Sequence, residues 1–131
     1  MKFLKHSILL LTLLSIAACS PDNGVYFENL KDGQEVTSPV TIKMGVVGME
    51  VEPAGPINDN KGHHHIIIDA GFISEGEMVP ANATNIHFGK GQTEHTLELS
   101  PGEHTLTLQF ANGVHQSYGE AWSKTITVNV K

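Results

Sequence analysis

Short stretches of alternating apolar and polar residues, separated by turn-forming residues, run through the chain from residue 25 onward. In the segment 40–46, for example, Val40, Ile42 and Met44 share one parity and polar residues lie between them. Because successive side chains of a strand point to opposite faces, this spacing predicts a strand with one buried face. No stretch sustains the apolar spacing of an amphipathic helix. The pattern therefore restricts the chain to an all-β fold.

About seven strands can be placed by this pattern. They cover residues 25–28, 40–46, 63–69, 86–88, 95–99, 104–110 and 123–130. Turn residues separate them every ten residues or so, and the proline- and glycine-containing regions 48–62 and 71–85 are expected to be long loops. This number and spacing of strands is typical of immunoglobulin-like domains. We therefore predict a single immunoglobulin-like antiparallel β-sandwich of about seven strands over residues 25–131.

The N-terminal segment has the composition of a secretory leader. Lys2 and Lys5 precede an apolar run over residues 8–14, which is too short to be a stable transmembrane helix. The segment 14–19, Leu-Ser-Ile-Ala-Ala-Cys, resembles a bacterial lipobox. This resemblance implies that the chain is cleaved before Cys19, the only cysteine, and that Cys19 then carries the lipid.

The leader sets an expected layout and location. Residues 1–18 are expected to be a lipoprotein signal peptide, residues 19–24 a lipidated tether, and residues 25–131 the folded domain. In the lipoproteins that this segment resembles, an aspartate after the cysteine favours retention at the inner membrane. Ser20 in that position therefore favours the outer membrane, with the domain facing the periplasm or the cell surface. The membrane, contacted through lipidated Cys19, is the first expected partner.

The charge of the mature chain excludes one class of ligand. Residues 19–131 contain six lysines, no arginine and fourteen carboxylates, a formal net charge of −8 with histidine neutral. Affinity for nucleic acid depends on cationic contacts to phosphate, so nucleic acid is not an expected partner. An acidic, histidine-rich domain is better suited to attracting cations.

Seven of the eight histidines lie in the mature chain, and three of them are consecutive. Period-two geometry places His63 and His65 on one face of a strand and His64 on the other. Two histidines at this spacing can chelate one metal ion from a single strand. The alternative is a polar cluster in which buried histidines hydrogen-bond to neighbouring loops, and both interpretations stay open here.

The other histidines fall into two groups. His87 is out of phase with its apolar neighbours and His115 lies in a polar loop after a turn, so both are free to approach the strand histidines. Imidazole is the commonest protein ligand for transition metals, and we predict a copper or zinc site formed by His63, His65, His87 and His115.

His104 follows a Pro-Gly turn at a strand start, where sandwich domains often hold a corner residue that bonds to upstream backbone. Its predicted role is therefore structural.

Supporting residues are also predicted. Met49 and Met78 lie in loops, and thioether ligands suit Cu(I). Asp69 and Glu94 are candidates to orient the metal-binding histidines without contacting the metal ion themselves. No Ser-His-Asp pattern is apparent in the sequence, and Cys19 is committed to the anchor. The domain is therefore expected to be non-enzymatic.

Four ordered motifs carry a family resemblance. GHHHIIID, HFGKGQTE, LSPGEHTLTLQFANGVHQSYG and SKTITVNV together resemble a bacterial family of periplasmic proteins and lipoproteins that is known as a domain of unknown function. The resemblance covers residues 25–130. It implies a small exported β-sandwich and supplies neither a reaction nor a ligand. His95 stands where the family is not expected to require histidine, and we leave it out of the predicted site.

Two other functions compete with metal binding. The domain could be an interaction module for an envelope protein, in which case Tyr26, Tyr118 and Trp122 would contribute an exposed aromatic patch and the histidines would be structural. It could instead be a cupin-like metal-dependent enzyme, because HxH is followed by a carboxylate at Asp69. The spacing departs from the cupin pattern, and a cupin needs more strands than the sequence provides.

Overall fold

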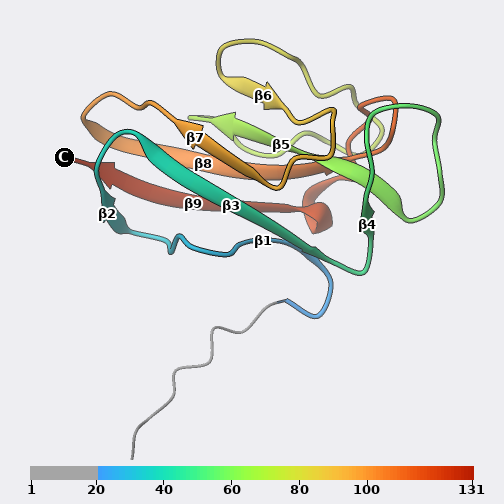
Figure 1. Ribbon diagram of the computed structural model, residues 1–131, viewed down its shortest axis with the longest axis horizontal. Coiled ribbons are helices and arrows are strands. Elements are labelled where there is room, and N and C mark those ends of the chain that lie inside the picture. Colours follow the sequence, from blue (N-terminus) through green and yellow to red (C-terminus); the bar gives the residue numbers. More distant parts are fainter. Residues whose placement is uncertain (1–20) are drawn as a thin grey trace, which may run out of the picture.

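The computed structural model describes residues 21–131, and these form nine strands and one short 3-10 helix (Figure 1). The elements are β1 (Gly24–Phe27), β2 (Gln34–Val36), β3 (Val40–Val47), β4 (Glu50–Val51), β5 (Lys61–Ile68), β6 (Asn85–His87), β7 (Glu94–Leu97), β8 (Gly102–Ala111), η1 (Glu120–Trp122) and β9 (Ser123–Val130). The predicted all-β class is confirmed. The leader and Cys19 lie outside the described residues. No helix within 21–131 has the length and apolar character needed to cross a membrane.

The strands form two sheets. One has the order β1-β3-β7, and the other has the order β2-β9-β8-β5-β4 with β6 paired to the same edge of β5 as β4. Most neighbours are antiparallel, but β2 pairs with β9 and β4 with β5 in parallel. The expectation of a wholly antiparallel arrangement is therefore wrong for these two pairs.

Two of the nine strands were not predicted. β2 has three residues and β4 has two, which is too short for a period-two pattern to be recognised. Both are strands because a longer neighbour supplies hydrogen-bonding partners, and tertiary pairing overrides weak local preference. The predicted loop over residues 48–62 is thus interrupted by β4.

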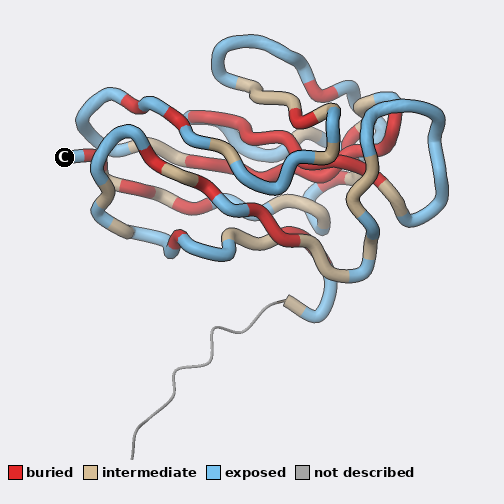
Figure 2. Tube along the Cα trace, viewed as in Figure 1, coloured by how far each residue is buried: buried red, intermediate tan, exposed pale blue. Residues whose placement is uncertain are grey.

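One apolar core lies between the sheets. Figure 2 shows buried segments along the facing strands. The core includes Val40, Ile42 and Met44 of β3, Leu106, Leu108 and Phe110 of β8, and Ile126, Val128 and Val130 of β9. These residues share one parity in each strand, and the buried face predicted for residues 40–46 is confirmed. Burial of each such side chain contributes on the order of 1.5–3 kcal/mol relative to exposure.

β5 is buried on both faces. Ile66 and Ile68 belong to the core between the sheets, and the opposite face is covered by the segments 70–84 and 112–119. Gln109 of β8 lies beside β5 on this covered face and is itself fully buried. Its side chain accepts a hydrogen bond from the Ile73 amide (3.0 Å) and donates one to the Gly119 carbonyl (3.1 Å). Both covering segments are thereby tied to the sheet.

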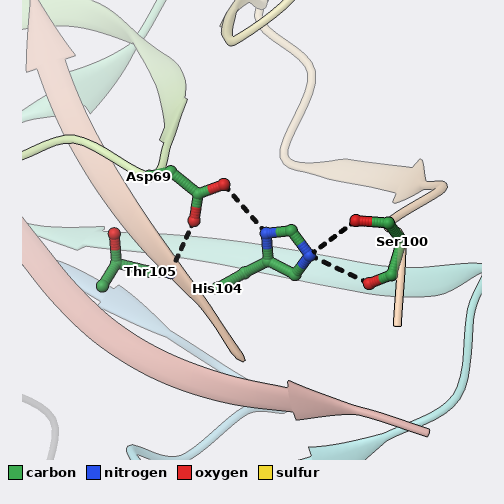
Figure 3. A network of polar contacts seen from close by, with 4 residues as sticks. All are labelled: Asp69, Ser100, His104 and Thr105. Atoms are coloured by element: carbon green, nitrogen blue, oxygen red, sulfur yellow. Dashed lines mark hydrogen bonds and ion pairs between the residues drawn. The ribbon is translucent and has the colours of Figure 1, made fainter. Parts of the chain in front are cut away.

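His104 contacts Asp69, which immediately follows the last residue of β5 (Figure 3). Asp69, in a left-handed conformation with φ of 57°, accepts a hydrogen bond from the Thr105 amide (3.0 Å) and lies 2.9 Å from His104 Nδ1. His104 Nε2 lies 2.9 Å from the Ser100 carbonyl oxygen, the kind of upstream backbone contact that a corner residue makes. A carbonyl oxygen can only accept, so Nε2 donates, and Asp69 favours a second proton on Nδ1. The hydrogen bond to Asp69 accordingly raises the pKa of His104.

Replacement of His104 with Gln should destabilise the domain in a pH-dependent way. At pH 6 we expect the free energy of unfolding to fall by about 1 kcal/mol, because solvent screens the half-exposed Asp69 carboxylate and reduces the contribution of its hydrogen bond to the imidazolium. The folded-state pKa is raised, so this contribution is fully present below the unfolded pKa near 6.5 and is lost as the pH rises through the folded pKa. Urea unfolding at pH 6 and pH 9 measures the difference.

Asp69→Asn provides the control for this measurement. Asparagine tolerates the left-handed conformation of residue 69 but carries no charge, so the variant should lose the same pH-dependent part of the stability. If His104→Gln lowered the free energy of unfolding equally at pH 6 and pH 9, the assignment of a charged His104 would be contradicted.

Candidate metal centre

Four histidine rings converge on the covered face of the six-stranded sheet. His63 and His65 come from β5, His87 from the end of β6, and His115 from the turn after β8. One ring nitrogen from each lies within 4.8 Å of all the others. His63 Nε2 is 3.0 Å from His115 Nδ1 and 3.2 Å from His87 Nε2. The structure thus brings together all four residues of the predicted site.

β5 supplies the buried half of the cluster. His63 and His65 are two residues apart on one face of the strand, and both side chains are at most 1% exposed. Their ring centroids are 4.8 Å apart. A regular strand holds such a pair in fixed orientation because neighbouring strands bond to its backbone on both sides.

β6 places His87 next to this pair. His87 and His65 are direct partners in the antiparallel register, so their side chains lie side by side on one face. The two rings are stacked, with centroids 5.2 Å apart. A Cβ atom at residue 89 would come within 2.3 Å of the His87 ring, so the glycine there leaves the space that the ring occupies.

A tight turn brings His115 over the cluster. The Asn112 side-chain oxygen accepts hydrogen bonds from the amides of Val114 (3.1 Å) and Gln116 (3.0 Å), and the His115 amide donates to the Asn112 carbonyl (2.9 Å). His115 itself has φ of 70°, a left-handed conformation that is uncommon for residues other than glycine. Such backbone conformations persist where surrounding contacts enforce them. Here the contacts are those of the turn and the bond from the Val79 amide to the His115 carbonyl (2.9 Å).

Burial keeps the strand histidines uncharged. Desolvation, reinforced by the neighbouring rings, lowers the pKa of His63 to about 4 and that of His65 to about 3. The pKa of His87 is lowered for the same reasons, desolvation first and then His115. At neutral pH these three rings therefore carry a free lone pair each, which is the form that binds metal ions.

The four clustered rings have more nitrogen atoms than there are hydrogen-bonding partners for them. His63 Nε2 faces two other ring nitrogens, although one nitrogen carries either a single hydrogen or a single lone pair. Within residues 21–131, the buried Nδ1 atoms of His63 and His65 have no partner at all. Buried polar atoms are nearly always satisfied, so this deficit calls for an explanation. A cation at the centre would engage the converging lone pairs together, that of His63 Nε2 among them, whereas protons are opposed by burial. The Nδ1 atom of His63 lies on the other side of its ring and would not contact the same ion.

The donor set and its spacing fit a transition metal. An all-imidazole site suits zinc and copper rather than calcium or magnesium, which prefer oxygen ligands. Zn–N bonds of about 2.0–2.1 Å in a tetrahedron place ligand nitrogens roughly 3.3 Å apart. Two nitrogen pairs, at 3.0 and 3.2 Å, are near that spacing, and all four ligand nitrogens lie within 4.8 Å of one another.

The predicted supporting residues are not at the cluster. Asp69 bonds to His104 and Thr105, so its predicted role behind the metal-binding histidines is wrong. Glu94 lies in the other sheet, where its register partner is Lys43. Met49 packs against the core, and Met78 is 59% exposed. The carboxylate predictions failed because sequence proximity to a histidine does not show which histidine a side chain faces.

His64 and His95 lie outside the cluster. His64 points to the core face, where its ring centroid is 5.0 Å from that of Phe110 and neither ring nitrogen has a partner among the described residues. The triplet is therefore divided as the period-two pattern predicts. His95 lies on β7 with its ring 5.2 Å from that of Phe88 and is not part of the cluster.

One arrangement was missed in the sequence. Asp69, His104 and Ser100 are in contact in the order of a catalytic triad, with His104 Nε2 3.2 Å from Ser100 Oγ (Figure 3). Asp69 follows β5, whereas Ser100 precedes β8 and His104 lies near its start, so no local motif identifies the three together. The closer contact of Nε2 is the Ser100 carbonyl, to which it must donate a hydrogen. A nitrogen that donates is not free to take a proton from the serine, and the arrangement is better explained as a structural corner.

Replacement of His64 with Leu should stabilise the domain, most of all in acid. Burial lowers the folded-state pKa of His64 to about 4, so the unfolded state binds more protons between pH 6.5 and 4, and stability falls as the pH falls through this range. At pH 5 this linkage amounts to about 2 kcal/mol. The variant should therefore gain about that much more stability over the wild type at pH 5 than at pH 7 in urea unfolding. An equal difference at both pH values would contradict the assignment of a neutral, buried His64.

Comparison with known proteins places the chain in a family. The family model described as "Domain of unknown function (DUF4399)" matches residues 42–131, which is more than half of the chain and includes all four clustered histidines. Searches of the curated proteins and of the solved structures found no match. The expectation of a domain-of-unknown-function family is thus confirmed at that level, and the chain belongs to the DUF4399 family.

Proposed function

We propose that this protein binds one copper or zinc ion through His63, His65, His87 and His115. The single observation that carries the proposal is that four ring nitrogens from three separate elements lie within 4.8 Å of one another. Two of these rings are fully buried, and the converging nitrogen of His63 faces two other ring nitrogens at once. Such a convergence costs stability unless a ligand compensates for it.

The competing structural interpretation explains these contacts less well. A polar network stabilises a fold when its members are fully hydrogen-bonded, and a partly satisfied network is worse than an apolar cluster. The contrast with the His104 corner is direct, because both nitrogens of His104 have oxygen partners. In the metal-binding interpretation, one ion engages the converging lone pairs of several rings at once.

We further propose that the domain is non-enzymatic. Four imidazoles complete a four-coordinate site, whereas catalytic zinc sites usually have three protein ligands and leave a position for water or substrate. This saturation also argues against the cupin-like alternative.

The proposed setting is the bacterial outer membrane. We propose an exported lipoprotein that is anchored through Cys19, with Ser20 favouring the outer membrane and an immunoglobulin-like sandwich as the folded part. The leader and the lipobox resemblance support the anchor, and two sheets around one core support the sandwich. The charge of −8 favours cations over nucleic acid.

The alternative of an envelope-protein interaction module receives less support. Tyr26, Tyr118 and Trp122 do not form an exposed patch: all three are only half-exposed, and Tyr118 and Trp122 pack against the core. The Tyr118 hydroxyl donates to the Lys61 carbonyl (2.7 Å). The aromatic residues therefore serve the fold, and an envelope partner is left without a surface of that kind.

Metal titration tests the proposed function. We expect the mature protein, purified in detergent after metal removal, to bind one Zn²⁺ or Cu²⁺ per chain in calorimetry, with a dissociation constant below micromolar. The double variant His63→Gln, His65→Gln should lose this binding because it removes both strand ligands. His95→Gln is the matched control, since His95 lies outside the cluster, and it should bind like the wild type. Absence of binding tighter than micromolar would refute the proposal.

Bound metal should also stabilise the fold. A ligand that binds only the native state at a hundred times its dissociation constant adds about 2.7 kcal/mol to the free energy of unfolding. We expect the thermal midpoint to rise with added zinc and to return on chelation. The rise should be absent in the double variant and present in His95→Gln. A zinc-induced rise of equal size in the double variant would show that the ion binds elsewhere.

A further inference from the structure

A short segment between β4 and β5, residues 52–57, contacts every element that carries a clustered histidine. We call it the strap. Its backbone amides donate three hydrogen bonds: from Glu52 to the Gly62 carbonyl (2.7 Å), from Ala54 to the Gly89 carbonyl (2.9 Å) and from Gly55 to the Gly113 carbonyl (2.9 Å). These bonds use no strap side chain, so nothing in the side-chain pattern of this segment reveals them.

Each acceptor lies next to a clustered histidine in the sequence. Gly62 immediately precedes His63, Gly89 follows His87 by two residues, and Gly113 precedes His115 by two residues. Through these three carbonyls the strap is bonded to the backbone beside three of the four ligands.

The contact with the His115 turn leaves no spare room. A Cβ atom at residue 113 would lie 2.2 Å from the Pro56 carbonyl oxygen and 2.6 Å from that of Gly55. Both are backbone atoms, which cannot rotate away as the end of a side chain can. The glycine is therefore required for the turn to lie directly on the strap.

The two outer ligands depend on this contact more than the strand pair does. His87 and His115 are half-buried, their ring centroids are 4.4 Å apart, and they come from a three-residue strand and a turn. No backbone hydrogen bond joins residues 85–91 directly to residues 111–118 in the described part of the chain. The strap bonds to both segments and bridges them.

We propose that the strap positions His87 and His115 relative to each other and so sets the affinity of the metal site. The inference rests on the proposed function, and the strap residues are positioning residues that do not contact the ion. Groups that orient metal ligands without contacting the ion typically change metal affinity by about 10–100-fold when they are altered. A strap contact of this kind is expected to act in the same range.

Gly113→Ala tests the proposal while leaving all four histidines in place. We expect its zinc affinity to fall at least 10-fold at an unchanged stoichiometry of one ion per chain. Gly55→Ala is the matched control: it adds the same methyl group within the strap, but its Cβ atom would meet nothing within 4 Å and its amide is kept. It should bind zinc with the affinity of the wild type. Wild-type affinity in Gly113→Ala would overturn the proposal.

A second readout separates the strap from metal binding itself. In the metal-free wild type, NMR should detect a nuclear Overhauser effect between the ring protons of His63 and His115, whose centroids are 5.1 Å apart. The effect should be lost in Gly113→Ala and kept in Gly55→Ala. If the wild type bound no zinc, the proposed function would fail, and this comparison would still decide whether the strap positions His115.

A further variant covers the case in which Gly113→Ala does not fold. Ala54→Pro removes the amide that donates to the Gly89 carbonyl and adds no atom at the turn. It should weaken zinc binding at least 10-fold and shift the ring signals of His87 in the metal-free protein. Unchanged affinity together with unchanged His87 signals would overturn the proposal.

Discussion

The rest of the structure depends on the burial of β5 on both of its faces. One face closes the apolar core with Ile66 and Ile68, and the other places His63 and His65 under two covering segments. β8 pairs along most of its length on one edge, while β4 and β6 share the other edge. A strand held in this way keeps its alternation, so a run of three histidines is divided between an apolar core and a polar site.

Imidazole has opposite electrostatic environments at the two ends of β5. At the Asp69 end, a carboxylate and a carbonyl surround His104 and stabilise its charged form. At the other end, four rings face one another without any carboxylate in the cluster, and the charged forms of His63 and His65 are disfavoured. The first arrangement needs protons on both nitrogens, and the second leaves lone pairs free for a cation. The same residue type thus serves the fold in one place and forms a candidate site in the other, and the difference is the available partners.

The sequence predicted the structure correctly where the alternation of apolar and polar residues extended along a whole strand. Alternation predicted the all-β class, the buried face of β3, and the opposite directions of His63 and His64. It missed β2 and β4, which are too short to show a period, and it misassigned Asp69, because the histidine that a carboxylate faces is decided by the pairing of distant strands. The strap could not be predicted at all, since it acts through backbone amides that every residue except proline possesses.

The range of the family match bears on how the site is built. Residues 42–131 include β4 to β9, the strap, and the three glycines that accept its hydrogen bonds, whereas β1 and β2 precede this range. Every element that carries or positions a clustered histidine therefore lies within the DUF4399 domain. The β1-β3-β7 sheet covers the core face of β5 and contributes no ligand. That sheet closes the core, and the candidate metal site is formed by the six-stranded sheet and the segments that lie over its covered face.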